Sequence, residues 1–119
     1  TQNFACERYS FGRSIANFQI TRHKLADMIS KIEMLGAFVD KCVDRAVQGV
    51  DFTREVSMLK LVGAKIAQDV LGECVQIHGG AGLMQEYIVA RYFRDSKLFS
   101  IGGGTDEIMK EIIAKYEQR

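Results

Sequence analysis

The amino-acid sequence predicts an all-α protein folded as an up-down antiparallel helical bundle. Two long segments carry apolar residues at steps of three and four, the repeat of a helix with one buried face. The 119 residues contain no proline, so nothing of that kind interrupts a helix interior. No segment alternates apolar and polar residues as a half-buried strand would. A chain of this length makes one domain or a piece of one.

The first predicted helix runs from Ile20 to Val47. Charged residues occupy most positions outside its apolar stripe, and Gly49 stands where such a helix would end. The stripe consists of Leu25, Met28, Ile29, Ile32, Leu35, Val39, Cys42, Val43 and Ala46.

The second predicted helix runs from Thr53 to His78, with Asp51 or Thr53 as its N-cap. Gly63 and Gly72 lie inside it, where glycine is unfavourable, so we expect them to mark close approach of a neighbour. The short turn between the two helices makes them an antiparallel hairpin. The second stripe consists of Val56, Leu59, Val62, Ile66, Ala67, Val70, Leu71, Cys74 and Ile77.

Two shorter helices follow, each separated from the preceding helix by glycines. After the cluster at 79–82, a helix is predicted from Tyr87 to Leu98. The run Gly102–Gly104 breaks the chain again, and Thr105 then caps a last helix whose first turn is acidic. We expect the core to unite both long stripes with this last helix.

The composition excludes several classes of function. Sixteen basic residues face 15 acidic ones, so no strong field holds nucleic acid by charge alone. Charges interrupt every apolar stretch, so we expect no membrane span. Cys6, Cys42 and Cys74 form no C-x-x-C pair, and with two histidines in the chain their spacing predicts no metal site. Three reduced thiols fit the bacterial cytoplasm or the mitochondrial matrix.

Several polar or glycine-rich groups have both a chemical and a purely structural interpretation. The N–H groups of Gly102–Gly104, just ahead of a helix, suit an anion or a developing oxyanion, although a tight turn with positive φ needs the same residues. His78 is a candidate base or a capping residue. Glu86, Arg94 and Asp95 suggest a charged site or an ion-pair network. Arg8 and Arg13 suit a phosphate, or are simply solvated.

Four motifs, in order and correctly spaced, give the chain a resemblance to acyl-CoA dehydrogenases. They cover essentially the whole chain, and the resemblance is to the C-terminal helical domain of that family. It therefore implies that residues 1–119 are a fragment, with the N-terminal helical and β domains absent. The motifs are ERYSFGR at 7–13 with Phe18 and Gln19, QIHGGAG at 76–82, RDSK at 94–97 and IGGGTDEI at 101–108.

The resemblance implies the chemistry of the full-length enzyme. A base removes a proton from the α carbon of an acyl-CoA thioester, the β carbon delivers a hydride to the flavin of FAD, and trans-2-enoyl-CoA forms. Electrons then leave through an electron-transferring flavoprotein. Relatives are homo-oligomers, as dimers or tetramers, with the flavin held between subunits. The isolated chain is expected to be inactive.

The resemblance also implies which residues contact FAD. Arg8, Ser10 and Phe11 would face the pyrophosphate and adenosine of a neighbouring subunit's cofactor, with Gln19 as a weaker adenine contact. Gln76 and Gly80 would meet an adenosine across another interface.

At the last helix, Thr105 and Glu107 would lie near the flavin's own phosphates and ribityl chain. The Gly103 N–H would donate to the thioester oxygen.

One departure from the family pattern concerns the catalytic acid. Most relatives carry a glutamate where this chain has Gly103, and a glycine supplies no general base. Long-chain and isovaleryl members also lack it there and take the base from an upstream helix, which would precede residue 1. Two alternatives stay open: a non-catalytic assembly module, and a relative with monooxygenase-like or nitroalkane-oxidase-like chemistry.

Overall fold

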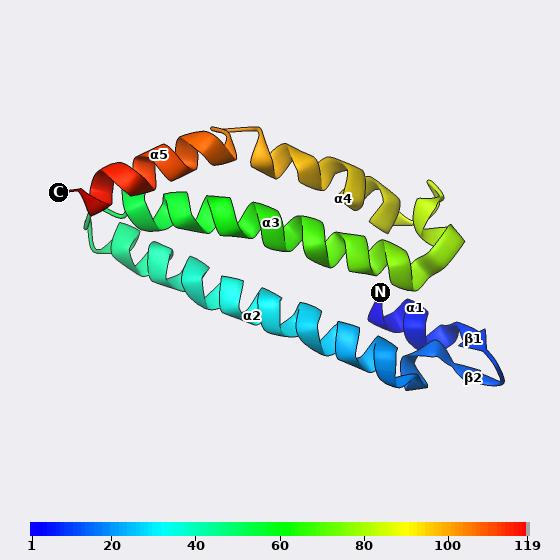
Figure 1. Ribbon diagram of the computed structural model, residues 1–119. Helices are drawn as coiled ribbons and strands as arrows, with labels where there is room; N and C mark the ends of the chain where they lie inside the picture. Colours follow the sequence, from blue (N-terminus) through cyan, green and yellow to red (C-terminus); the bar gives the residue numbers. More distant parts are fainter. Residues whose placement is uncertain (119) are drawn as a thin grey trace.

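The computed structural model describes residues 1–118 and contains three layers of helix (Figure 1). The central layer is α3 (Thr53–His78), which packs against α2 (Gln19–Val47) on one side. On its other side lie α4 (Ile88–Ser96) and α5 (Asp106–Glu117), end to end. The all-α, up-down antiparallel prediction is confirmed. The remaining elements are α1 (Gln2–Glu7), β1 (Tyr9–Ser10), β2 (Arg13–Ser14) and 3₁₀ helices at Ile15–Asn17, Gly79–Leu83 and Lys97–Ser100.

The long hairpin forms as predicted. The observed start of α2 is one residue earlier than expected, and α3 has the predicted bounds. Gly49 has φ +68°, a left-handed conformation that glycine adopts without strain, and it ends α2. Neither candidate is the N-cap of α3, which is Phe52. The Asp51 carboxylate nevertheless accepts the free N–H of Thr53, at 3.0 Å.

The helices after α3 are broken more finely than predicted. The segment expected from Tyr87 to Leu98 begins as α4 at Ile88 and tightens into a 3₁₀ helix after Ser96. The start of α5 agrees with the sequence, because the Thr105 hydroxyl accepts the N–H of Ile108 at 3.4 Å.

The expectation of no strand is wrong at one place, the hairpin of β1 and β2. Tyr9 pairs with Ser14 and Ser10 with Arg13, across a two-residue turn. Phe11 (φ 51°) and Gly12 (φ 77°) are both left-handed, as the tightest hairpin turns require. The buried Ser14 hydroxyl donates to the Ala5 carbonyl at 2.8 Å, which fastens the hairpin to α1.

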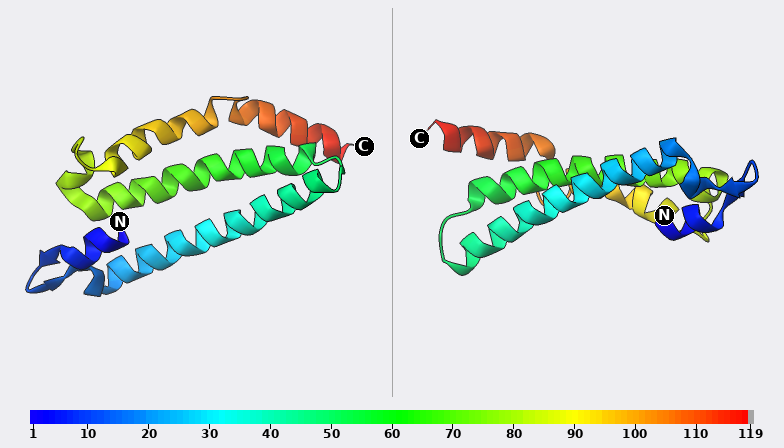
Figure 2. Two further views of the ribbon diagram at one scale, coloured as in Figure 1. Left: turned by 180° about the vertical axis from the view of Figure 1, so that it is seen from behind. Right: turned by 90° about the horizontal axis from the view of Figure 1, so that it is seen from below.

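The core is thin. The buried apolar residues include Met28 and Cys42 of α2, Ala64 of α3 and Met109 of α5, so both long helices and the last one do contribute to it. Much of the predicted stripes is nevertheless exposed, as at Ile29 (44%) and Val43 (52%). The radius of gyration is 17.5 Å, whereas a compact domain of this length has about 13–14 Å. The molecule is rod-shaped, with extents of 59 × 24 × 23 Å, and its elongation is plain in Figure 2.

The two interior glycines of α3 do not have the role predicted for them. A Cβ on Gly63 would lie 3.5 Å from the Leu35 side chain, and one on Gly72 would lie 3.7 Å from Phe93. Both are ordinary van der Waals distances, so a close approach does not require glycine at either position.

No helix within residues 1–118 is both long enough and apolar enough to cross a membrane. Among the same residues, no group of three histidine, cysteine or acidic side chains is placed to hold a metal ion. All three cysteines are free thiols.

Candidate functional site

The glycine turn, Gly102–Gly104, joins the 3₁₀ helix Lys97–Ser100 to α5. Its entry is fixed by the Leu98 carbonyl, which accepts the N–H groups of Ile101 (3.0 Å) and Gly102 (2.7 Å). Gly103 (φ +66°) and Gly104 (φ +104°) are left-handed. These residues therefore form the tight turn with positive φ that the structural interpretation predicted. A chemical role for their N–H groups is a separate question.

The turn also leaves two backbone donors unused. The Gly102 N–H bonds within the turn, whereas those of Gly103 and Gly104 have no hydrogen-bond acceptor within residues 1–118, and of these two residues Gly103 is the exposed one. Gly103 is exposed, and a Cβ placed there would have Lys60 Cε as its nearest neighbour, at 3.9 Å. An unpaired N–H in open space can reach a ligand's oxygen, which is what oxyanion binding requires.

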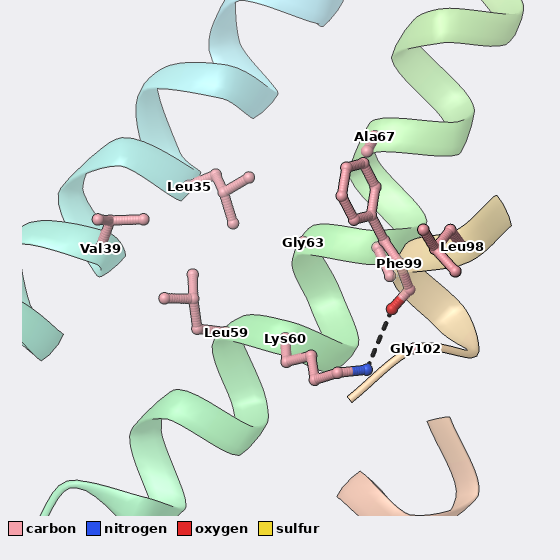
Figure 3. Close-up of a pocket in the computed structure, with 10 residues that line it drawn as sticks. Leu35, Val39, Leu59, Lys60, Gly63, Ala67, Leu98, Phe99 and Gly102 are labelled. Carbon is pink, nitrogen blue, oxygen red and sulfur yellow. Dashed lines mark hydrogen bonds between the residues drawn. The ribbon is translucent and has the colours of Figure 1, made fainter. Parts of the chain in front are cut away.

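Two side chains of α3 hold this segment, and the sequence analysis did not find them. The Lys60 ammonium donates to the carbonyl oxygen of Phe99, at 3.1 Å (Figure 3), and to that of Gly104. The Gln68 amide donates to the Ser100 hydroxyl at 2.6 Å. No local pattern announces such contacts, because the acceptors of Lys60 are backbone groups about forty residues further along the chain.

Thr105 and Glu107 stand at the start of α5. The Thr105 hydroxyl caps the helix. The fully exposed Glu107 carboxylate has a pKa lowered from 4.5 by a hydrogen bond to its own backbone N–H, then by the Thr105 hydroxyl and by Lys110 and Lys97. Here the anion is stabilised by the helix N-terminus.

A second cluster lies at the C-terminal end of α3. The hairpin hollow, about 350 Å³, brings Ser10 and Phe11 of the β-hairpin beside Gln76 of α3. The sequence analysis placed these residues at separate interfaces, whereas the structure puts all of them around one space. Phe11 is 94% exposed, so its ring is available to a ligand. The other lining residues are Ile15, Phe18, Ile20, Thr21, Lys24 and Ile77.

Three further predicted residues lie near this hollow in sequence but do not line it. Arg8 is exposed between α1 and β1, and its guanidinium has no ion-pair partner in the described chain. Gln19 is the exposed first residue of α2, immediately before the lining residue Ile20. Gly80 is exposed after α3, and a Cβ there would meet no atom within 4 Å.

The same glycine cluster contains a position that is sterically fixed. A Cβ on Gly82 would lie 2.6 Å from the Val75 carbonyl oxygen, a distance that real Cβ atoms do not adopt. Gly82 is buried and closes the 3₁₀ helix back against the end of α3. Its spacing within 76–82 was part of the resemblance, but no role had been assigned to it.

The remaining candidates have structural surroundings. His78 Nδ1 lies 2.7 Å from the Cys74 carbonyl, which can only accept, so this nitrogen carries the proton. The ring also stacks on Phe4, with centroids 4.1 Å apart. Arg94 pairs with the adjacent Asp95 at 3.0 Å on an exposed surface, where such pairs contribute little stability. The structural interpretation of His78 is confirmed, but the predicted network shrinks to the Arg94–Asp95 pair, because Glu86 is exposed and has no ion-pair partner within residues 1–118.

The two clusters are separated along α3. Lys60 adjoins the glycine turn and Gln76 lines the hairpin hollow, sixteen residues later. At about 1.5 Å per residue the separation along the helix axis is about 24 Å. A single small ligand does not span both, so the clusters serve either distant parts of one large ligand or two ligand molecules.

Comparison with known proteins identifies close relatives. The family described as "Acyl-CoA dehydrogenase, C-terminal domain" matches residues 1–117. The mitochondrial long-chain specific acyl-CoA dehydrogenase of Mus musculus is 40% identical over 116 residues, 97% of this chain and 27% of that protein. The caffeyl-CoA reductase–Etf complex subunit CarC of Acetobacterium woodii is 35% identical over 111 residues, 93% of this chain and 29% of CarC.

A solved structure has the same fold. The acyl-CoA dehydrogenase from Geobacillus kaustophilus matches with a TM-score of 0.96 at 36% identity, covering 99% of this chain and 31% of that one. The chain thus spans less than a third of the length of each of these proteins.

Proposed function

The chain belongs to the acyl-CoA dehydrogenase family, whose C-terminal domain it matches over residues 1–117, and we propose that it is that domain of an FAD-dependent acyl-CoA dehydrogenase. It would supply FAD-binding and oligomerisation surfaces to a longer protein, with helical and β domains ahead of residues 1–119. That protein would convert an acyl-CoA thioester to trans-2-enoyl-CoA. The observation that carries the proposal is the unpaired, exposed N–H of Gly103, on a left-handed turn directly before α5.

The Gly103 N–H would donate to the thioester oxygen. Proton removal from the α carbon moves negative charge onto that oxygen, and a fixed donor there stabilises the enolate-like state. Gly103 itself brings no acid, so the base would come from a helix preceding the chain. For the same reason we expect the isolated chain to be inactive.

The residues around the hairpin hollow fit the adenosine and pyrophosphate end of FAD. An exposed ring, a hydroxyl and an amide share one space at Phe11, Ser10 and Gln76. The free Arg8 guanidinium has the planar fork that matches phosphate oxygens. A Cβ on Gly80 would meet no atom within 4 Å, so a cofactor could approach the backbone at this residue. Gln19 would be a weaker adenine contact.

Thr105 and Glu107 would serve a different part of the flavin site, near its phosphates and ribityl chain. Lys60 ties the residue before Thr105 to α3 about 24 Å along the helix from Gln76, which lines the hairpin hollow. This separation supports an arrangement in which one chain contributes to two cofactor molecules in an oligomer. When bound, FAD would accept the hydride that leaves the β carbon. This chain's residues would bind and orient the cofactor and hold the thioester oxygen.

The same proposal implies partner proteins and a cellular location. Exposed apolar residues on both long helices support a homo-oligomer, as a dimer or a tetramer. The relationship to CarC, whose name places it in an Etf complex, supports an electron-transferring flavoprotein as the electron acceptor. Free thiols and a mitochondrial relative support the bacterial cytoplasm or the mitochondrial matrix.

The test uses the full-length protein with FAD bound. It is mixed anaerobically with straight-chain and branched acyl-CoA thioesters, while flavin absorbance and enoyl-CoA are followed. We expect one enoyl-CoA per flavin reduced. Binding of flavin and acyl-CoA without reduction would favour the assembly module. A product that forms only with O₂ and carries its oxygen would favour the monooxygenase-like alternative.

A second arm tests the displaced base. Replacing the upstream acid with its amide should lower turnover by about 10² to 10⁴. Adding Gly103→Glu should restore part of that loss, because a Cβ there would meet its nearest neighbour, Lys60 Cε, at 3.9 Å, an ordinary contact distance. Recovery should be incomplete, because the left-handed backbone at Gly103 strains any side chain and a misplaced base is inefficient. No loss on removing the acid would contradict the displaced base.

A further inference from the structure

We propose that Lys60 is a positioning residue, which holds the glycine turn in the shape that presents the Gly103 N–H. This inference rests on the proposed function and adds to it a residue from α3. The family motifs in the sequence do not include Lys60.

The geometry is that of a clamp. One ammonium donates to the Phe99 carbonyl, at 3.1 Å (Figure 3), and also to the Gly104 carbonyl, so a single charge ties together the two ends of the segment 99–104. Gly103 lies inside the closed segment. A compact ammonium with three donors suits this task, because carbonyl groups can approach it from several directions.

The hydrogen bonds of Lys60 distinguish it from the other interhelical lysines. Lys24 and Lys31 pair with the carboxylates Glu73 and Asp69 of α3. Within residues 1–118, Lys60 has no carboxylate partner, and both of its acceptors are backbone carbonyls of the segment it closes. Its charge therefore serves the shape of the segment.

The side chains around Lys60 are mostly apolar. Lys60 lies at the edge of an apolar hollow of about 530 Å³ between α2, α3 and the segment 98–102. Leu35, Leu59 and Leu98 line the hollow, and Lys60 is the charged residue among its lining residues. The other lining residues carry no charge, so within the described chain the two carbonyls are the acceptors of the ammonium.

The turn needs such a clamp because of its own sequence. Three consecutive glycines have more accessible backbone conformations than any other residues, and ordering them is correspondingly costly. The bonds to Leu98 fix the turn only as far as Gly102. The next fixed point is the Thr105 cap of α5. Lys60 closes the interval between them, where the reactive N–H lies.

The experiment compares three variants of the full-length FAD-bound enzyme: Lys60→Met, Lys60→Arg and the control Lys65→Met. Lys65 is exposed on the same helix and has no hydrogen bond or ion pair within the described chain. Lys60→Met should slow flavin reduction at saturating acyl-CoA by roughly 10- to 100-fold, since small misplacements of reacting groups cost that much. The KM for acyl-CoA and the FAD content should stay within about twofold. Lys60→Arg should recover part of the rate.

Two readouts separate positioning from a merely structural role. Phenylacetyl-CoA carries an acidic α hydrogen but no hydrogen on its β carbon, so its α-hydrogen exchange in D₂O reports proton removal without oxidation. Lys60→Met should slow this exchange by the same factor as flavin reduction. Backbone hydrogen exchange in peptides covering 99–105 should also accelerate in Lys60→Met and not in Lys65→Met.

The outcomes are distinguishable. A wild-type enzyme that reduces no flavin with any acyl-CoA overturns the proposed function and the role of Lys60 with it. Normal wild-type activity with unchanged rates per flavin in Lys60→Met overturns Lys60 alone, even if that variant is less stable. If Lys60→Met yields no folded enzyme, Lys60→Arg decides, because an unchanged rate of α-hydrogen exchange and unchanged exchange at 99–105 would contradict the clamp.

Discussion

Phe4 of α1 stacks on His78 at the end of α3, with the ring centroids 4.1 Å apart and the planes inclined by 24°. Tyr87 packs edge-on against both rings, at 5.9 Å in each case. The cluster joins α1 to the end of α3 and to the start of α4, directly after Gln76 and Ile77, which line the hairpin hollow. It therefore positions α1, and through α1 the β-hairpin that carries Phe11.

We expect Phe4→Ala to loosen the hairpin. Removing a half-buried ring should lower the free energy of unfolding by about 2 kcal/mol, roughly half the cost at a fully buried site. Backbone hydrogen exchange at residues 8–15 should accelerate, and FAD affinity should fall. Phe38→Ala, on α2 outside the cluster, is the control and should leave exchange at the hairpin unchanged. Equal exchange at 8–15 in both variants would contradict this role for Phe4.

Gly82 and Gly80 form a matched pair. Gly82→Ala should destabilise the protein by about 1–3 kcal/mol, because its Cβ would collide with the backbone oxygen of Val75. Gly80→Ala meets open space, so stability should change by less than about 0.5 kcal/mol. If Gly80 lies against FAD, affinity for FAD should nevertheless fall, by roughly tenfold. Thermal unfolding measures the change in stability, and flavin titration measures the change in FAD affinity. A Gly80→Ala variant that is destabilised but binds FAD normally would contradict the role assigned to Gly80.

Arg8 is the residue that we expect to determine phosphate recognition. Arg8→Ala should weaken FAD binding by about 10- to 100-fold, the range for losing a charge-assisted hydrogen bond. Arg8→Lys should recover only part, because an ammonium lacks the planar fork. Flavin titration at several salt concentrations is the measurement, with exposed Arg91→Ala as the control. An Arg8→Ala variant with unchanged affinity would exclude the guanidinium from the cofactor site.

The lowered pKa of Glu107 predicts a small dependence of stability on pH. Its folded-state pKa lies below the unfolded value of 4.5, so the stabilisation is fully present above pH 4.5. It is lost as the pH falls through the folded-state pKa. The difference in unfolding free energy between wild type and Glu107→Gln should therefore shrink as the pH is lowered below 4.5. A difference that does not change with pH would contradict this ionisation.

The long helices could be predicted from the sequence because their patterns are long. Over the 26 residues of α3, the apolar repeat and the glycines beyond it leave little choice of boundary. The β-hairpin was missed because strands of two residues are too short to alternate, and its turn uses a left-handed Phe11 that no residue preference announces. The stripes were identified correctly, but periodicity shows which face is apolar and not what covers it.

The candidate site was predictable to a different degree. Motif spacing located Gly103 and the cap at Thr105, because both act through local backbone geometry. It did not bring Ser10 to Gln76, since that proximity depends on how α1 lies against the end of α3. The role of Lys60 could not be predicted either, because its partners are backbone carbonyl groups, which every residue carries.

The separation of the two clusters along α3 limits how the length of this helix can change during evolution. Inserting one residue between Lys60 and Gln76 would turn one cluster by about 100° relative to the other and move it by about 1.5 Å. Even an insertion of about four residues, which nearly restores the rotation, would lengthen the spacing by about 6 Å. Substitutions are tolerable along this stretch, but insertions and deletions are not. Length variation should instead be found in exposed connections such as Gln48 to Phe52, where no site would lose its register.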